Sequence, residues 1–401
     1  MILDLFSELQ KARADWRGDP EQAVLDEALE QVKLADELGY GCWWTVEHHG
    51  ATEFSYSSAP ELVVTAFAQH TRRIRFGHAG ILAPFAINHP LRVAERAAAM
   101  DRLSGGRLEL GLARSGGTEW DTFGVDPDTS RDQLEQALRM IPRMWTEKRF
   151  SWKSDLLEIP ERDVVPKPLQ DPHPPLWQTC TSPESFELAG RLGVGALATT
   201  LLSPLETLAE LLAFHERGLS QCREPAGRSV NSRRAVFTFM HVAESRDEAI
   251  ASRAADQALW FVNAAPRVFQ VPRSIWIDAI RGDIQSSDPA ATRSLAAPEE
   301  PPRDDDLDDP VAVIRLLNRQ RAGIELDPVE VFEALEPLES VVIGDPDACL
   351  GKARGYAAIG VDRLMALMAF GALPQERVLS SIRLAAEHLL PALAGEGRGD
   401  G

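Results

Sequence analysis

The chain has 401 residues, 26% of them charged and 44% hydrophobic, and this composition excludes a disordered tail, a collagen-like rod and a disulfide-rich mini-protein. Its 42 lysines and arginines stand against 61 aspartates and glutamates, and the formal charge of −19 argues against nucleic acid or an anionic membrane as a partner. No run of about 18 apolar residues exists and the N-terminus lacks the features of a signal peptide, so we expect no membrane segment and a cytoplasmic protein.

Short apolar runs alternate with amphipathic stretches along the whole chain. Apolar residues recur at helical spacing over residues 22–38, Gly39 ends that helix, and a buried strand follows. By these criteria the expected strands are residues 3–6, 42–46, 74–82, 107–113, 176–181, 196–200, 235–242 and 363–369. The expected helices are residues 22–38, 60–70, 91–103, 130–148, 183–192, 204–219, 246–263 and 375–390. Eight β-α units favour an α/β fold with a closed (β/α)8 TIM barrel over an open sheet, as one domain over residues 1–401.

One segment, residues 270–310, departs from this alternation because it is rich in proline, serine and acidic residues. It contains Ser-Ser-Asp-Pro at 286–289 and three consecutive aspartates at 304–306. Such a composition does not bury a core. We expect an irregular insertion that is either a solvated linker or a mobile lid, since it follows the seventh strand and helix of a barrel whose active face is built from such loops.

Glu47, His48 and His49 directly follow the second expected strand. The carboxyl ends of barrel strands face the active site, where a histidine can act as an acid or a base near neutral pH. Glu47 would orient such a histidine or shift its pKa. Because neighbouring side chains at a strand end point in opposite directions, at most one of the two histidines is expected to enter the site. A packed or capping histidine pair would give the same triplet.

Two further features are typical of phosphate binding. Arg114 ends a strand and precedes glycines, and a guanidinium beside a glycine-rich loop matches phosphate oxygens. Three hydroxyl residues, Thr181, Ser182 and Ser185, surround the start of a helix, where free backbone N–H groups also bind phosphate. A tight turn with a surface arginine and a simple serine cap are the alternatives for the two features.

The cysteines give no sign of a metal or of disulfides. They are scattered without a Cys-x-x-Cys spacing, at Cys42, Cys180, Cys222 and Cys349. Reduced thiols fit this pattern better than a zinc site or a disulfide framework, and no metal is expected.

Several motifs, taken in order, resemble one known family. They are Trp-Thr-Val-Glu-His-His at 44–49, the block from 77 to 131, Ile-Gly-Asp-Pro-Asp at 343–347 and Gly-Val-Asp-Arg-Leu-Met at 360–365. Together they resemble the bacterial luciferase-like flavin monooxygenases, whose fold is a (β/α)8 barrel. The resemblance covers nearly the whole chain outside 270–310.

The resemblance implies a two-component monooxygenase. Reduced FMN would come from a separate flavin reductase and react with O₂, and the resulting C4a-(hydro)peroxide would oxygenate a small apolar or aromatic substrate. His48 would be the catalytic residue, assisted by Glu47. The positions matched to cofactor binding are Arg114, Arg131, Ser182 and Ser185 for the phosphate, Thr181 where luciferase has a glutamate, and Ala79–Gly80 as a non-prolyl cis peptide beneath the flavin ring. Loop aromatics would line the substrate pocket, namely Phe54, Tyr56, Phe85, Trp120 and Phe123.

Other readings stay open. Ala113 stands where luciferase has a reactive cysteine, so light emission is not implied. A deazaflavin-dependent hydride-transfer enzyme and a non-catalytic flavin-binding barrel are the alternatives on the same fold. The resemblance also implies a homodimer through the helices at 60–70 and 91–103, with Ala94, Ala97 and Ala98 as a small-residue contact face; packing of these alanines on the barrel is the alternative.

Overall fold

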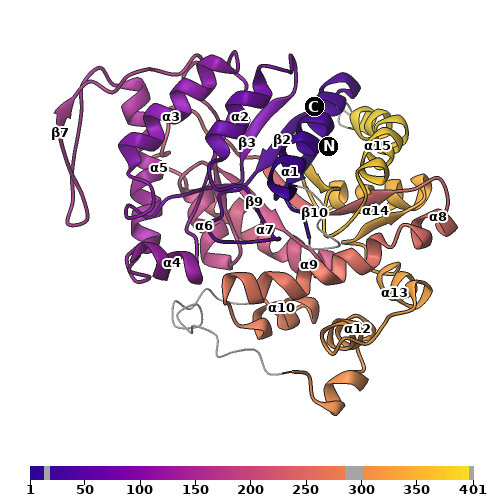
Figure 1. The fold of residues 1–401 in the computed structure, drawn as a ribbon. Coiled ribbons are helices and arrows are strands. Elements are labelled where there is room, and N and C mark those ends of the chain that lie inside the picture. Colours follow the sequence, from indigo (N-terminus) through magenta and orange to yellow (C-terminus); the bar gives the residue numbers. More distant parts are fainter. Residues whose placement is uncertain (13–18, 285–300, 397–401) are drawn as a thin grey trace.

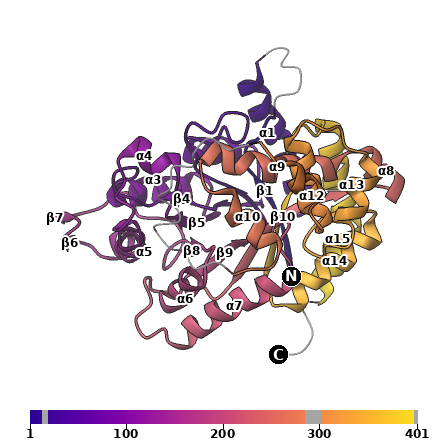
Figure 2. The same ribbon diagram turned by 90° about the horizontal axis from the view of Figure 1, so that it is seen from below.

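The computed structural model describes residues 1–12, 19–284 and 301–396. Its centre is a barrel of eight parallel strands with helices around it (Figures 1 and 2). The barrel strands in order are β1 (Ile2–Ser7), β2 (Cys42–Thr45), β3 (Arg75–His78), β5 (Leu108–Ala113), β8 (Leu176–Thr179), β9 (Gly195–Thr199), β10 (Arg234–Val242) and β12 (Arg363–Leu367). β12 pairs with both β10 and β1, which closes the ring. The predicted (β/α)8 barrel and its eight strands are confirmed.

Two short strands accompany the barrel. β4 (Ile81–Leu82) continues the third strand and pairs with β5, and β11 (Val342–Gly344) pairs with β10 outside the ring. A two-stranded hairpin that we did not predict, β6 (Phe150–Lys153) and β7 (Glu158–Arg162), projects from the barrel in Figure 1.

The helices cover the outside of the barrel. They are α1 (Pro20–Leu38), α2 (Pro60–Ala68), α3 (Pro90–Leu103), α4 (Thr118–Phe123), α5 (Ser130–Thr146), α6 (Pro183–Arg191), α7 (Leu205–Ser220), α8 (Arg246–Ala251), α9 (Ala254–Phe269), α14 (Pro346–Ala358) and α15 (Gln375–Glu396). The single helix expected at 246–263 is wrong. It is divided into α8 and α9, because Arg253 between them has φ of 57°, which no α-helix accommodates.

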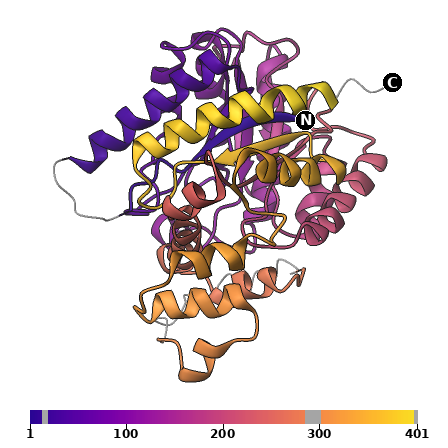
Figure 3. The same ribbon diagram turned by 90° about the vertical axis from the view of Figure 1, so that its right-hand side faces the viewer.

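Residues 270–284 and 301–310, the described parts of the segment 270–310, are more ordered than its composition predicts. It contains α10 (Arg273–Ile280) and the 3₁₀ turn η1 (Asp304–Asp308), and Trp276 and Ile280 pack against the core. The later helices α12 (Ala312–Arg321) and α13 (Pro328–Leu335) contact α9 and form the orange layer below the barrel in Figure 3. Residues 285–300 lie outside the described part of the chain, so the lid stays a prediction.

Two tryptophans fill the inside of the barrel. Trp44 and Trp177 are fully buried, and their rings meet edge to face at 5.4 Å between centroids. Each ring occupies the space in front of a glycine on the neighbouring strand: a Cβ at Gly77 would collide with Trp44, and one at Gly195 with Trp177. Packing of large rings against glycines therefore closes the core at this level. In the described part of the chain, no helix combines the length and the apolarity that crossing a membrane requires.

Candidate active site

A cavity of about 350 Å³ opens at the carboxyl ends of the barrel strands. Loops that follow β1, β2, β5 and β8 contribute to it, together with the ends of α9 and α10. The nine residues predicted to be catalytic or to bind the cofactor all line this one cavity, namely Glu47, His48, Ala79, Gly80, Arg114, Arg131, Thr181, Ser182 and Ser185. The fold thus brings together side chains that are up to 138 residues apart in the sequence, the separation of Glu47 and Ser185.

His48 is held by two carboxylates. Its Nδ1 lies 3.1 Å from Oε1 of Glu119, and its Nε2 lies 3.8 Å from Oε2 of Glu8. Its side chain is 22% exposed and packs on the ring of Phe269. Burial lowers the pKa of His48, but the hydrogen bond to Glu119 and the negative charges of Glu8, Glu119 and Glu47 outweigh it and raise the pKa above its usual value.

The hydrogen bonds of Glu47 go to residues other than His48. Its carboxylate accepts hydrogen bonds from the backbone N–H of Leu82 at 2.8 Å and from the amide of Asn88 at 2.9 Å. It also lies 3.2 Å from Nε2 of His49, and this hydrogen bond raises the pKa of His49. The two histidines therefore have different partners, as the opposite directions of adjacent side chains predict.

Glu119, in α4, is a site residue that the sequence reasoning missed. It is 2% exposed and accepts hydrogen bonds from the hydroxyl of Ser115 at 2.6 Å and the backbone N–H of His49 at 3.0 Å, besides its contact with His48. Burial raises the pKa of Glu119, but these hydrogen bonds and the His48 charge outweigh burial. The pKa of Glu119 therefore lies below its usual value. An ionised Glu119 can only accept, so Nδ1 of His48 carries the proton and Nε2 is left for the cavity.

Two arginines, Arg114 and Arg131, also line the cavity. Burial and the charge of Arg131 lower the pKa of Arg114 to about 10. The guanidinium of Arg114 lies over the ring of Trp120, 5.3 Å from its centroid. Two like charges in one partly buried wall repel each other, and an anion bound between them would relieve that repulsion.

The start of α6 is a capping box. Ser182 accepts from the backbone N–H of Ser185, while the Ser185 hydroxyl accepts from the N–H groups of Thr181 and Ser182 at 3.1 and 3.0 Å. Capping therefore occupies both serine hydroxyls, which is the alternative that the sequence left open for this helix start. Thr181 is exposed and lines the cavity.

The floor of the site is a close contact between backbones. The Ala79–Gly80 peptide bond is cis, as the resemblance implied. A Cβ at Gly80 would come within 2.8 Å of the backbone of Gly111 on β5, so no larger residue fits there. In contrast, a Cβ at Gly116 would meet nothing within 4 Å, which leaves open space beside the arginines.

The apolar lining differs from the expected one. Of the five loop aromatics, Phe54 lines the cavity, while Tyr56, Phe85, Trp120 and Phe123 are not among its lining residues. The other rings come from the barrel and α9, namely Phe6, Phe237, Phe261, Phe269 and, from α10, Trp276. A period-two pattern shows which strand residues point inward. It does not show whether those residues line a cavity or pack in a closed core, and the strand aromatics were therefore not expected in the lining.

Several polar atoms around the cavity lack hydrogen-bond partners in the described part of the chain. They are Oε2 of Glu8, Oε1 of Gln178, Oγ1 of Thr179 and Oγ1 of Thr199. Buried polar atoms normally have a partner, so four orphans around one cavity indicate a polar ligand. Among the described residues, no cluster of three or more histidine, cysteine, aspartate or glutamate side chains could hold a metal ion.

Comparison with known proteins gives a consistent result. A family model described as luciferase-like monooxygenase matches residues 9–363. The oxygenase component of a flavin-dependent trigonelline monooxygenase from Acinetobacter baylyi is 31% identical over 184 residues, 45% of this chain and 50% of that protein. Limonene 1,2-monooxygenase from Rhodococcus erythropolis is 32% identical over 232 residues, 56% of this chain and 57% of that protein. The chain thus spans about half the length of these curated relatives.

Solved structures agree in fold. The monooxygenase RslO1 from Streptomyces bottropensis has a TM-score of 0.73 and 22% identity, covering 98% of this chain and 100% of that one. The oxygenating constituent of 3,6-diketocamphane monooxygenase from Pseudomonas putida, solved in complex with FMN, has a TM-score of 0.69 and 17% identity, with 98% of both chains covered. At these identities the likeness establishes the barrel fold and nothing finer.

Proposed function

The chain belongs to the luciferase-like monooxygenase family, and from that premise we propose that it is an oxygenase that uses reduced FMN and O₂ to oxygenate a small apolar or aromatic substrate. One observation carries the proposal: a single cavity joins a wall of two arginines to a wall with a titratable histidine. The first wall suits the phosphate of a cofactor and the second suits proton transfer to or from a substrate.

The residues around the cavity fit FMN. Arg114 and Arg131 would hold the phosphate, because a dianion offsets their mutual repulsion, and Thr181 faces the same space. The unpartnered oxygens of Gln178 and Thr199 would meet polar groups of the flavin. When bound, reduced FMN supplies the electrons that activate O₂.

In this proposal, residues of the chain transfer protons and keep water out of the pocket. Glu119 fixes the ring of His48 through Nδ1, so Nε2 faces the cavity and can accept a proton from a substrate or return one to it. Phenylalanine rings around the cavity exclude water and favour an apolar or aromatic substrate.

A flavin reductase is proposed as the source of reduced FMN. Support comes from the similarity to the oxygenase component of the trigonelline monooxygenase. We expect the purified chain to turn over only when a reductase or chemically reduced FMN is supplied, with no need for a stable complex between the two proteins.

The phosphate site gives the direct test of the proposal. We expect FMN to bind roughly 10–150-fold more tightly than riboflavin, because a charge-assisted hydrogen bond contributes about 1.5–3 kcal/mol. Arg114→Ala should remove most of that difference, measured by flavin fluorescence or calorimetry. Arg139→Ala is the matched control, because Arg139 lies on the surface of α5 and pairs with Glu135.

Three results would count against the proposal in different ways. Equal affinities for FMN and riboflavin would mean that the phosphate site is misassigned. Selective binding of a deazaflavin would favour the hydride-transfer alternative. Tight FMN binding without reaction of the reduced complex with O₂ would favour a non-catalytic flavin protein.

We further propose a homodimer through the outer faces of α2 and α3. Leu62 on α2 and Leu103 on α3 support it, because 69% and 57% of their surfaces are exposed on adjacent helices. The alanine face considered first is wrong, since Ala94, Ala97 and Ala98 are buried within the chain. Light scattering should give twice the 44.1 kDa of one chain, and Leu62→Glu should halve that mass while Val230→Glu, exposed elsewhere, should not. A wild-type particle of one-chain mass at micromolar concentration would exclude the dimer.

A further inference from the structure

Glu8 is a buried carboxylate that no feature of the sequence singled out. It directly follows β1, is 4% exposed and lines the cavity. Its backbone is fixed, because its carbonyl accepts a hydrogen bond of 2.6 Å from the hydroxyl of Ser55. Its Oε2, however, has no hydrogen-bond partner among the described residues. A carboxylate oxygen in this position needs a partner that the fold itself does not supply.

A polar atom of His48 lies close to that oxygen. Nε2 of His48 lies 3.8 Å from Oε2 of Glu8, just beyond hydrogen-bond distance. The other ring nitrogen is occupied by Glu119, which the hydroxyl of Ser115 in turn holds at 2.6 Å. Glu119, His48 and Glu8 therefore form a row, with the imidazole between two carboxyl groups, and all three residues line the cavity.

We propose that Glu8 is the second acid–base group of this site and shares one proton with Nε2 of His48. In one state a neutral Glu8 carboxyl faces a neutral imidazole, and in the other a Glu8 carboxylate faces an imidazolium. The proton moves from Oε2 to Nε2, and the total charge does not change. Glu8 thereby sets whether His48 meets the substrate as a base or as an acid. This role rests on the proposed function, but the pair itself can be tested without it.

The electrostatics of the row favour a shared proton. Burial raises the pKa of Glu8 to about 7, with the His48 charge lowering it and the Glu119 charge raising it. The pKa of His48 is also above its usual value, since the charges of Glu8, Glu119 and Glu47 outweigh the effect of burial. The like charge of His48 lowers the pKa of His49, whose hydrogen bond to Glu47 raises it. Two interacting titratable groups that lie this close titrate as a pair.

The first experiment follows the imidazole directly. The C–H resonances of His48 are titrated by NMR in the full chain without flavin, and they are assigned by their loss in His48→Ala. Glu8→Gln removes a negative charge and keeps the shape, so the pKa of His48 should fall by about 1–3 pH units, the effect of losing an opposite charge at this range. Glu95→Gln, the same change on α3 outside the cavity, should leave the titration as in the wild type.

Glu8→Asp keeps the charge on a shorter side chain and should give a pKa of His48 between those of the wild type and Glu8→Gln. It also serves if Glu8→Gln fails to fold. An unchanged His48 titration in Glu8→Gln, or in Glu8→Asp if that is the folded variant, would overturn the proposed pair.

The second experiment follows turnover with reduced FMN. In Glu8→Gln the lower pKa of His48 should move the acidic limb of the pH–rate profile to lower pH, with FMN affinity unchanged. A structural role alone would lower the rate at every pH without moving the limb, and that outcome would also overturn the proposal. Absence of oxygenation in the wild type, with the NMR shift present, would refute the proposed function and leave the proton-sharing pair in place.

Discussion

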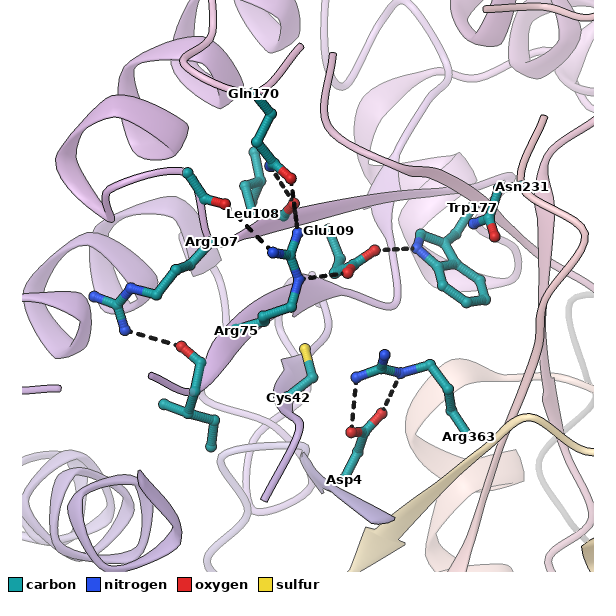
Figure 4. A network of polar contacts seen from close by, with 12 residues as sticks. Asp4, Cys42, Arg75, Arg107, Leu108, Glu109, Gln170, Trp177, Asn231 and Arg363 are labelled. Carbon is teal, nitrogen blue, oxygen red and sulfur yellow. Dashed lines mark hydrogen bonds and ion pairs between the residues drawn. The ribbon is translucent and has the colours of Figure 1, made fainter. Parts of the chain in front are cut away.

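The two ends of the barrel interior use buried polar groups in opposite ways. At the amino end, each charged side chain labelled in Figure 4 has a partner. Arg363 donates to both oxygens of Asp4 at 2.7 and 2.8 Å, and Trp44 donates to the same carboxylate. Glu109 accepts from Arg75 at 2.6 Å and from Trp177 at 2.8 Å.

At the carboxyl end, several buried polar groups lack hydrogen-bond partners among the described residues. Oxygens of Glu8, Gln178 and Thr199 have no hydrogen-bond partner among the described residues. The positive charge of Arg131 lowers the pKa of Arg114. Both ends are formed by the same strands, and packed aromatic rings of the core lie between them. Buried polar groups that complete their hydrogen bonds within the chain therefore indicate the end that supports stability. Buried polar groups without partners indicate the end that binds a ligand.

The largest effect at the open end is expected from His48→Ala. Turnover at saturating reduced FMN should fall by ~10²–10⁴-fold, since this group is the proposed acid–base residue. FMN affinity should stay within a few-fold. His49→Ala should be milder in rate. Wild-type turnover in His48→Ala would remove His48 from the mechanism.

The largest effect at the closed end is expected from Asp4→Asn. It leaves the guanidinium of Arg363 buried without a counter-charge, and breaking such a pair costs about 3–5 kcal/mol. The loss should be visible as a lower free energy of unfolding in urea, with flavin affinity unchanged in the folded fraction. The double variant Asp4→Leu with Arg363→Met should recover much of the stability. A cost below about 1 kcal/mol for Asp4→Asn would mean that this network is not what stabilises the amino end.

The smallest effect distinguishes a hydroxyl with a partner from one without. Thr199→Val removes an unpartnered hydroxyl, so the free energy of unfolding should change by no more than about 0.5 kcal/mol. Thr238→Val on β10 removes a hydrogen bond to the carbonyl of Ser340 and should cost about 1 kcal/mol. FMN affinity should fall only in Thr199→Val. Equal stability costs in the two variants would contradict the contrast between partnered and unpartnered hydroxyls.

By itself the sequence determined the barrel and much of its active face. The alternation of apolar runs and amphipathic helices specifies eight strands, because burial imposes those periods locally. It also placed Glu47 and His48 at one strand end and Arg114 at another, and strand ends of a parallel barrel meet on one face. These inferences need only residues that are close in the chain.

Only the tertiary structure decided which side chains meet. Glu8 and Glu119 lie 40 and 71 residues from His48, and their approach depends on strand register and barrel closure. The same holds for the burial of Ala98, since an apolar helix face is equally suited to the barrel and to a partner until packing is known. Local patterns report how a side chain is oriented on its own element. Contacts across the barrel arise from the arrangement of all eight strands at once, so no single stretch of sequence carries them.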